Sequence, residues 1–433
     1  MDENSALKSK EANSIKSSIK EYTDNIFNNK STKTIENNRN VVKPAEKNNI
    51  EIKENVENDK NGISNNQKII KKRNAGIDLI RIVAMIGIVY THILYQGRGI
   101  LTYPKYRTRI LSSYTYIFWH NNAYALISGI VGYKSTKYSN LLYLWLCVVF
   151  FSLIIRFYYL IFRKNAKLED KLKDFFPAIS GSYWYFTAYF VMFLFLPAIN
   201  KGIQHLSKPE FKLLVMGIYG ILISWQTLMN NKEDHFQMNK GISSLWLLCL
   251  YIIGAYIGKY NIVYTGIKRY ILIVIYLTIF IFLCTLFNKY SYTVVSNTGN
   301  NNPILIYIIK KLLPDDINNI YKATLSLSVT LFFLQLKYNE YLSKIISFLG
   351  PLTFGVYLIH LNPNVVNNYL SNILNGESRN LTENEVIRMF ILKVIKIFVV
   401  CIIFEYLRYL LFNILKIREI CIFIERIAYK IAS

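Results

Sequence analysis

Three ionisable side chains lie in the first apolar stretch after residue 73, namely Asp78, Arg81 and His92. Ionisable groups inside a stretch that can span a membrane are costly and usually mark a functional site. Histidine is suited to act as a general base toward a hydroxyl, because its unperturbed pKa is about 6.5. Arginine can hold phosphate groups, and a neighbouring carboxylate can fix its orientation. The residue types therefore predict chemistry at a polar site within a membrane.

The spacing of these residues places them on one helix face. From Arg81 to His92, an α-helix turns by about 1100°, about 20° beyond three full turns, and rises by about 16.5 Å. Asp78 lies on the same face one turn earlier. Because such a stripe is costly against lipid, we expect it to line a polar cavity in a helix bundle. The alternative is that Asp78 and Arg81 form an interfacial positioning pair and His92 snorkels at the outer border.

The composition indicates a membrane protein. Of 433 residues, 52% are hydrophobic, 15% aromatic and only 18% charged, whereas soluble domains carry about 25% charged residues. So apolar a composition, with so few charged residues, excludes a soluble enzyme and a secreted disulfide scaffold. The net charge of +24 does not indicate a nucleic-acid partner, because much of the excess lies in short gaps between apolar runs rather than on a water-exposed face. The expected surroundings are a lipid bilayer, with no nucleic acid.

Apolar runs recur after Gly76, and each is about as long as a membrane-spanning helix requires. They predict an all-α fold, a polytopic membrane bundle of about ten transmembrane helices. The ranges are 77–95, 113–133, 140–162, 183–200, 211–229, 242–258, 268–288, 322–338, 346–361 and 394–415. Gly254 and Gly258, four residues apart, predict close helix packing within this bundle.

The two ends of the chain are expected to lie outside the bundle. Residues 1–75 contain 16 Asn and few aromatic residues, which predicts a disordered tail. The Lys71-Lys72-Arg73 cluster favours a cytosolic N-terminus, and ten spans return the basic tail 416–433 to the same side. The long gaps 163–182, 289–321 and 362–393 then face the opposite side. We expect an integral protein of the plasma membrane with both termini cytosolic.

Other polar residues in or beside the apolar runs admit two interpretations. His120 is more typical of a residue at the membrane–water interface than of a second general base. His360 follows a Gly/Pro interruption at 350–355, where irregular backbone is tolerated only against protein or a water-filled cavity. It is therefore a candidate for the substrate side. Glu405 and Arg408, three residues apart, favour a structural ion pair over a site role. The five cysteines have no metal or redox spacing, so we expect no metal.

The segment GIDLIRIVA at 76–84, followed by Thr91-His92, resembles the opening helix of the acyltransferase-3 family of integral membrane acyltransferases. That family is marked by an arginine, ten intervening residues and a histidine. Other segments that look like family segments occur in the same order. They are Leu126–Gly129, Trp184–Tyr189, Leu245–Leu247, Tyr251–Gly254 and Phe354–His360. The resemblance covers about residues 76–415.

The resemblance implies transfer of an acyl group, commonly acetyl, from cytosolic acetyl-CoA or another acyl-CoA to a hydroxyl of a carbohydrate or lipid-linked glycan across the membrane. Arg81 and His92 would be the catalytic pair. Many members carry an arginine pair after the Ser-Gly element, but this chain has Lys134 and Lys137 after Ser128. Lysine holds phosphate as a point charge and lacks the bidentate fork of arginine.

Distance along the helix divides the roles. Arg81 is too far from His92 to touch an atom that His92 also touches, so we place Arg81 near the cytosolic mouth, where it holds part of the CoA arm. Asp78 fixes its guanidinium, and Ser128, Lys134 and Lys137 belong to the same cofactor side. His92 removes the hydroxyl proton where donor and acceptor meet. The candidates for the substrate side are His360, His120 and Trp184.

Two other functions remain open. A proton-coupled secondary transporter of a small acid or sugar would use Asp78, Arg81 and His92 as a relay, but the chain has no convincing internal repeat of broken helices. A non-catalytic scaffold would recruit partners through the N-terminal tail. The acyltransferase is the favoured interpretation.

Overall fold

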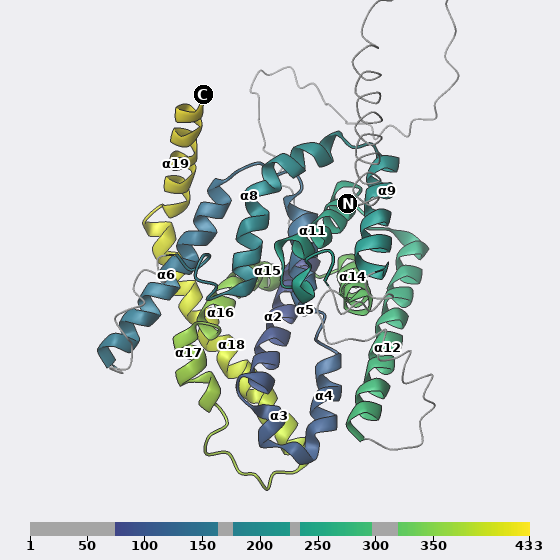
Figure 1. The fold of residues 1–433 in the computed structure, drawn as a ribbon, viewed down its shortest axis with the longest axis vertical. Coiled ribbons are helices and arrows are strands. Elements are labelled where there is room, and N and C mark those ends of the chain that lie inside the picture. The colour runs from purple at the N-terminus through teal and green to yellow at the C-terminus, as the bar shows by residue number, and fades with distance from the viewer. Residues whose placement is uncertain (1–73, 163–175, 226–233, 297–318) are drawn as a thin grey trace, which may run out of the picture. The chain divides into compact units, whose positions relative to one another are not determined.

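The computed structural model describes residues 74–162, 176–225, 234–296 and 319–433 (Figure 1). Nearly all of the predicted N-terminal tail lies outside these ranges, as do parts of the long gaps at 163–182 and 289–321. Within the described ranges the chain forms helices and turns and no strand. The all-α prediction is therefore confirmed.

The helices follow one another closely along the chain. In order they are α2 (Ala75–Tyr95), α3 (Gly99–Thr102), η1 (Pro104–Tyr106), α4 (Arg107–Thr115), α5 (His120–Gly132), α6 (Ser139–Phe162), α8 (Trp184–His205), α9 (Lys208–Gly217), the π-helix η3 (Ile218–Trp225), η4 (Asn239–Gly241), α11 (Ser244–Lys259), α12 (Gly266–Ser296), α14 (Ile320–Gln335), α15 (Glu340–Leu349), η5 (Gly350–Leu352), α16 (Thr353–His360), α17 (Pro363–Asn368), η6 (Leu370–Asn372), α18 (Glu383–Ile414) and α19 (Ile417–Ala432).

In the described ranges, five helices are long and apolar enough to cross a membrane. They are Ala75–Tyr95, Ser139–Phe162, Trp184–His205, Gly266–Leu286 and the continuous segment Glu340–His360. α11 and α14 are apolar but shorter. α18 has 32 residues and carries seven charged side chains. By length and composition, five of the ten predicted runs therefore correspond to membrane-spanning helices, and these support the membrane bundle.

The predicted run 113–133 is not one helix. The chain turns at residues 116–119, between α4 and α5. The indole N–H of Trp119 donates to the Tyr116 carbonyl at 2.9 Å. This side-chain bond occupies a backbone acceptor that a continuous helix would use, which favours the turn. The prediction of a single span over 113–133 is wrong, and α5 begins at His120.

α2 is the central helix of the described structure (Figure 1). It begins at Asn74, whose side chain accepts a hydrogen bond from the Gly76 N–H at 2.9 Å, and Asp78 lies in its first turn. Both features stabilise a helix N-terminus. α2 contacts α5, α14, α15, α16 and α18. Its ionisable residues therefore lie on a helix surrounded by other helices.

α5 packs closely against α11. A Cβ placed on Gly254 would overlap the Leu126 carbonyl, and one on Gly129 would overlap the Tyr251 carbonyl. Gly258 makes a similar approach to α5. The glycines therefore allow the two backbones to touch, as their spacing predicted.

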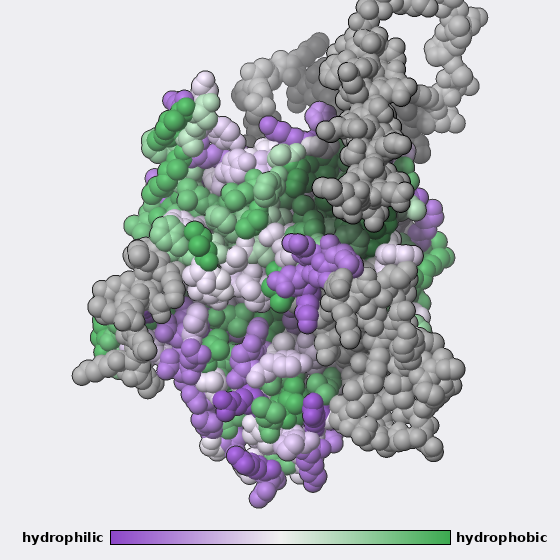
Figure 2. Space-filling view, viewed as in Figure 1, coloured by the Kyte–Doolittle hydropathy of each residue, from purple (hydrophilic) through white to green (hydrophobic). Residues whose placement is uncertain are grey.

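The surface differs from one part of the described chain to another. Hydrophilic residues gather at the end that carries α3, whereas hydrophobic residues cover much of the face around α6 and α8 (Figure 2). Most of the predicted basic tail 416–433 forms α19, which packs against α6 through Cys421. The chain enters α19 through Lys416, whose φ of 51° is left-handed.

Candidate functional site

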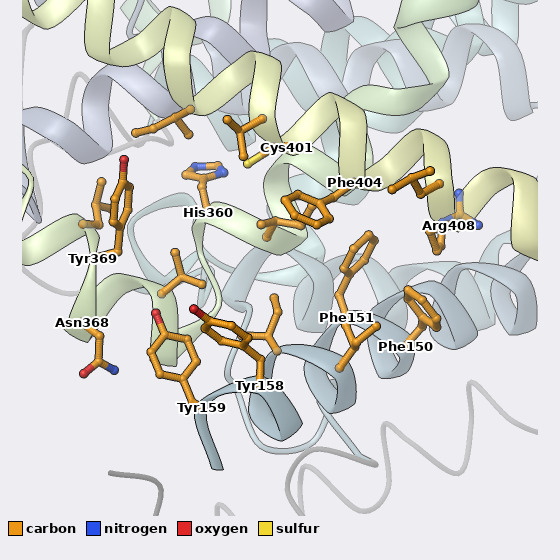
Figure 3. A pocket seen from close by; sticks show the side chains of 18 of the residues that line it. Phe150, Phe151, Tyr158, Tyr159, His360, Asn368, Tyr369, Cys401, Phe404 and Arg408 are labelled. Carbon is orange, nitrogen blue, oxygen red and sulfur yellow. The ribbon is translucent and has the colours of Figure 1, made fainter. Parts of the chain in front are cut away.

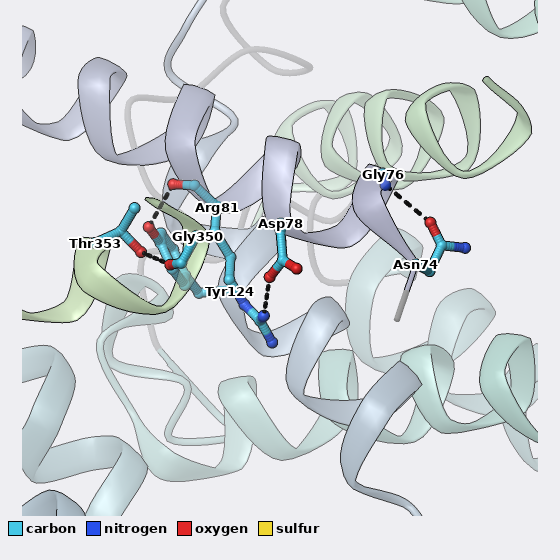
Figure 4. A network of polar contacts seen from close by, with 7 residues as sticks. All are labelled: Asn74, Gly76, Asp78, Arg81, Tyr124, Gly350 and Thr353. Carbon is cyan, nitrogen blue, oxygen red and sulfur yellow. Dashed lines mark hydrogen bonds and ion pairs between the residues drawn. The ribbon is translucent and has the colours of Figure 1, made fainter. Parts of the chain in front are cut away.

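The first group of polar residues lies at the start of α2 (Figure 4). Arg81 Nη1 donates to Asp78 Oδ1 at 2.7 Å. The Asp78 side chain is fully buried, whereas 21% of the Arg81 side chain is exposed. A Cβ on Gly350 would come within 2.6 Å of the Asp78 Cβ. Gly350 therefore lets the α15–α16 segment cover the carboxylate and leaves part of the guanidinium accessible.

α5 and α8 complete this end of the site. The Tyr124 hydroxyl donates to the Arg81 carbonyl at 2.7 Å, and the Ser128 hydroxyl donates to the Tyr124 carbonyl at 2.8 Å. Tyr189 of α8 interacts with both Ser128 and Arg81. The structure thus brings Asp78, Arg81 and Ser128 together, although they come from two helices.

Lys134 and Lys137 lie in the turn after α5, and both side chains are exposed. This turn is held by the buried Asn200, whose Nδ2 donates to the Gly132 carbonyl at 3.0 Å and to the Ser135 carbonyl at 2.7 Å. The sequence interpretation did not identify Asn200. The sequence feature that could have identified it is an amide side chain at the end of an apolar run. Such a side chain, when buried, requires hydrogen-bond partners.

The second group lies at the other end of α2. His92 Nδ1 is 2.8 Å from Gln96 Oε1, one helical turn later. The His92 and His360 rings are 5.5 Å apart between centroids, with 56° between their planes. His360 ends α16 and is 2% exposed. The structure therefore places two imidazoles from distant segments side by side.

The hydrogen bond of His360 fixes its proton. Nδ1 lies 2.5 Å from the Val356 carbonyl, and a carbonyl can only accept, so Nδ1 carries the hydrogen. Nε2 of the neutral ring then has a lone pair. This atom is buried and has no hydrogen-bond partner among the described residues. A buried acceptor without a partner is uncommon in a folded protein.

His120 also lies beside this group. Its Nε2 is 3.0 Å from Thr91 Oγ1, directly before His92 in the chain, and its Nδ1 is 2.9 Å from Asn121 Oδ1. Gly87 permits the approach, since a Cβ there would meet the His120 ring at 3.2 Å. His120 is 2% exposed. His120 is therefore buried in the helix bundle and packs against α2.

Trp184 begins α8, and its ring packs edge-on against Tyr185 at 5.3 Å. The preceding residue, Tyr183, links α8 to α16 because its hydroxyl donates to the Leu358 carbonyl at 2.9 Å. Asn362 Nδ2 donates to the same hydroxyl at 3.1 Å. The residue next to Trp184 therefore connects the start of α8 to α16.

The two groups are separated along one helix. Arg81 and His92 lie three turns apart, about 16.5 Å by helical rise. One end offers a guanidinium that can bind an anion, and the other offers imidazoles that can transfer a proton. In the described part of the chain, no three His, Cys, Asp or Glu side chains gather in a way that could hold a metal ion.

Comparison with known proteins identifies the domain. A family model of acyltransferase 3, described as an acyltransferase domain, matches residues 74–407. The match includes Asp78, Arg81, His92, His120 and His360. No curated protein and no solved structure matches the chain.

Proposed function

The chain belongs to the acyltransferase-3 family of membrane acyltransferases, and on that premise we propose that it transfers an acetyl or related acyl group from acyl-CoA to a hydroxyl. The proposed acceptor is a carbohydrate or glycolipid outside the cytosol. The donor enters at the Arg81 end of α2, which faces the cytosol in this proposal. Both chain termini are then cytosolic, and the host membrane is the plasma membrane.

The observation that carries the proposal is the division of α2 into an anion-binding end and an imidazole end. Arg81 makes one hydrogen bond to Asp78 and remains partly exposed. Its other N–H groups are available to phosphate oxygens, which arginine binds through two parallel bonds. Lys134 and Lys137 add positive charge on the same proposed side. Asp78 keeps the guanidinium oriented.

His92 acts as the general base in this reaction. It takes the proton of the acceptor hydroxyl while the hydroxyl oxygen forms a bond to the thioester carbonyl carbon. The carbon–sulfur bond then breaks, and the proton passes from His92 to the departing CoA sulfur. The Gln96 side chain fixes the His92 ring through Nδ1, so Nε2 is the atom that exchanges the proton.

The competing function is a proton-coupled secondary transporter of a small acid or sugar. It would use the same ionisable residues on α2. Membership in an acyltransferase family favours group transfer over transport, since transport requires neither an acyl donor nor a base toward a hydroxyl.

The test compares the surface glycans of cells that lack the protein after rescue with different variants. Mass spectrometry is expected to show acylation restored by the wild type and by His205→Ala, which removes an exposed histidine at the end of α8. His92→Ala is expected to lower acylation by about 100-fold or more at equal expression. Full rescue by His92→Ala would contradict the base assignment. Acceptor-free uptake of solute by proteoliposomes would instead support a transporter.

A further inference from the structure

A large apolar cavity lies between α6, α17 and α18, beside the imidazole end of the site (Figure 3). Its volume is about 830 Å³. This is within the range of about 300–1,000 Å³ that is typical of ligand sites. Its walls are mostly aromatic and aliphatic and include Phe150, Phe151, Ile154, Phe404 and Leu407. A hydrocarbon chain fits such a lining.

The cavity opens onto an apolar part of the surface. Among its lining residues, Ile154 is 51%, Tyr158 49%, Phe404 56% and Leu407 54% exposed. α6 is one of the helices that is apolar and long enough to span a membrane. The opening is therefore toward lipid, and a molecule already in the bilayer can enter from the side.

One end of the cavity is polar. Asn368 and Tyr369 lie there (Figure 3). Lys396 lines the same part of the cavity and is exposed. The same three residues border a smaller adjoining cavity of about 250 Å³. The neighbouring Lys393 is already paired with Glu377 at 2.6 Å. A lysine and an amide beside an apolar channel suit a molecule with an anionic headgroup and a long tail.

His360 connects the cavity to the reaction site. It lines the cavity, is 2% exposed, and its Nε2 has no hydrogen-bond partner among the described residues. Its ring also lies 5.5 Å from that of His92. His360 is thus the part of the cavity wall that lies next to the proposed base.

We propose that this cavity binds the hydrocarbon tail of an anionic, hydroxyl-bearing acceptor lipid, with the headgroup near Lys396 and the hydroxyl at the His360 wall, on the side of His92. The inference rests on the proposed function and names its acceptor class. The donor does not fit this role as well, because Arg81, which would hold its phosphates, lies three turns from His92 on α2.

The binding test uses a photoreactive probe, a hexadecyl phosphate with a diazirine in its tail, added to the full-length protein in nanodiscs without acyl-CoA. Illumination and peptide mass spectrometry are expected to place label on the α6 and α18 residues that line the cavity. Cys401→Trp and Leu407→Trp fill the cavity from two positions and are expected to remove most of this label. Ile403→Trp, an exposed position on α18 outside the cavity, is the matched control and should retain it.

A second comparison tests the charged end. Lys396→Gln is expected to lower labelling by the hexadecyl phosphate probe and to leave labelling by the corresponding uncharged alcohol unchanged. Thermal unfolding confirms that each variant is folded. The proposal is overturned if both folded tryptophan variants keep wild-type labelling, or if α12 residues on the lipid-facing surface are labelled as strongly as the cavity, which would indicate surrounding lipid only. Since the probe needs no turnover, this failure is distinct from failure of the glycan acylation test.

Discussion

Two ion pairs with the same sequence spacing differ in their burial and in the number of protein groups that bind the arginine. Asp78–Arg81 on α2 and Glu405–Arg408 on α18 are both carboxylate–guanidinium pairs three residues apart. In the α18 pair the side chains are 3% and 5% exposed. In the α2 pair the carboxylate is buried but 21% of the arginine side chain is exposed. The sequence pattern is the same, and the surroundings are not.

Each of the three guanidinium nitrogens of Arg408 donates to a protein group. Its Nη2 and Nε donate to Glu405 at 2.6 and 3.0 Å, and its Nη1 donates to the Tyr143 hydroxyl at 3.1 Å. Its guanidinium also lies 4.6 Å from the centre of the Phe412 ring. Arg81, in contrast, makes one ion-pair contact in the described chain. The two pairs therefore share a spacing but differ in how many protein partners the guanidinium has in the described chain.

The largest expected effect is on stability, at the α18 pair. Arg408→Leu leaves the Glu405 charge buried without compensation and is expected to lower the free energy of unfolding by about 3–5 kcal/mol. Thermal unfolding in detergent measures this. The double variant Glu405→Leu/Arg408→Leu should recover most of the loss, because it removes both charges. An unchanged melting temperature for the single variant would show that the pair is not structural.

The next effect is on donor binding, at the α2 pair. Arg81→Lys keeps the charge but loses the two-pronged geometry, and is expected to raise the KM for acyl-CoA about tenfold, or about 1.4 kcal/mol. Its melting temperature should change little. Arg408→Lys is the matched control, with lower stability and an unaltered KM. The contrast between the pairs is wrong if Arg81→Lys lowers stability without changing the KM and Arg408→Lys raises the KM without changing stability.

The glycines that face the two carboxylates offer a finer test. A Cβ on Gly350 would press on Asp78, and one on Gly355 would overlap the Glu405 carboxylate. Gly350→Ala and Gly355→Ala are each expected to cost about 1–3 kcal/mol, as overpacked cores do. The control is Gly202→Ala, which meets no atom within 4 Å. The measurement is the unfolding midpoint of each of the three variants. Equal midpoints would contradict the prediction that a Cβ at Gly350 or Gly355 crowds the adjacent carboxylate.

The smallest expected effect comes from Tyr124→Phe, which removes the hydrogen bond to the Arg81 carbonyl. The expected loss is about 0.5–1.5 kcal/mol of stability. The exposed Tyr270 provides a control through Tyr270→Phe, for which no change is expected. A loss in Tyr124→Phe equal to that of the control would show that this bond does not hold α5 to α2.

Helical periodicity made part of this arrangement predictable. It placed Asp78, Arg81 and His92 on one face of α2, and it paired Glu405 with Arg408, because these relations depend only on 3.6 residues per turn. The glycine contacts between α5 and α11 followed from spacing as well. The family resemblance extended over most of the range that the family model matches.

Contacts between distant segments were not predictable in the same way. No local pattern brings His360 to His92, or His120 to Thr91, because such contacts depend on how whole helices pack. The turn at 116–119 was also missed, since a side-chain hydrogen bond there replaces a helical one without changing the hydropathy. Nor does composition tell a buried amide such as Asn200 from one at a surface.

The single left-handed residue between α18 and α19 limits how α18 can move. α19 presents exposed apolar side chains together with basic ones, the pattern of a helix that lies in a membrane interface. With only Leu415 and Lys416 between the helices, a shift of α18 along its own axis would be passed on to α19. Because α19 also packs against α6, that contact would resist such a shift.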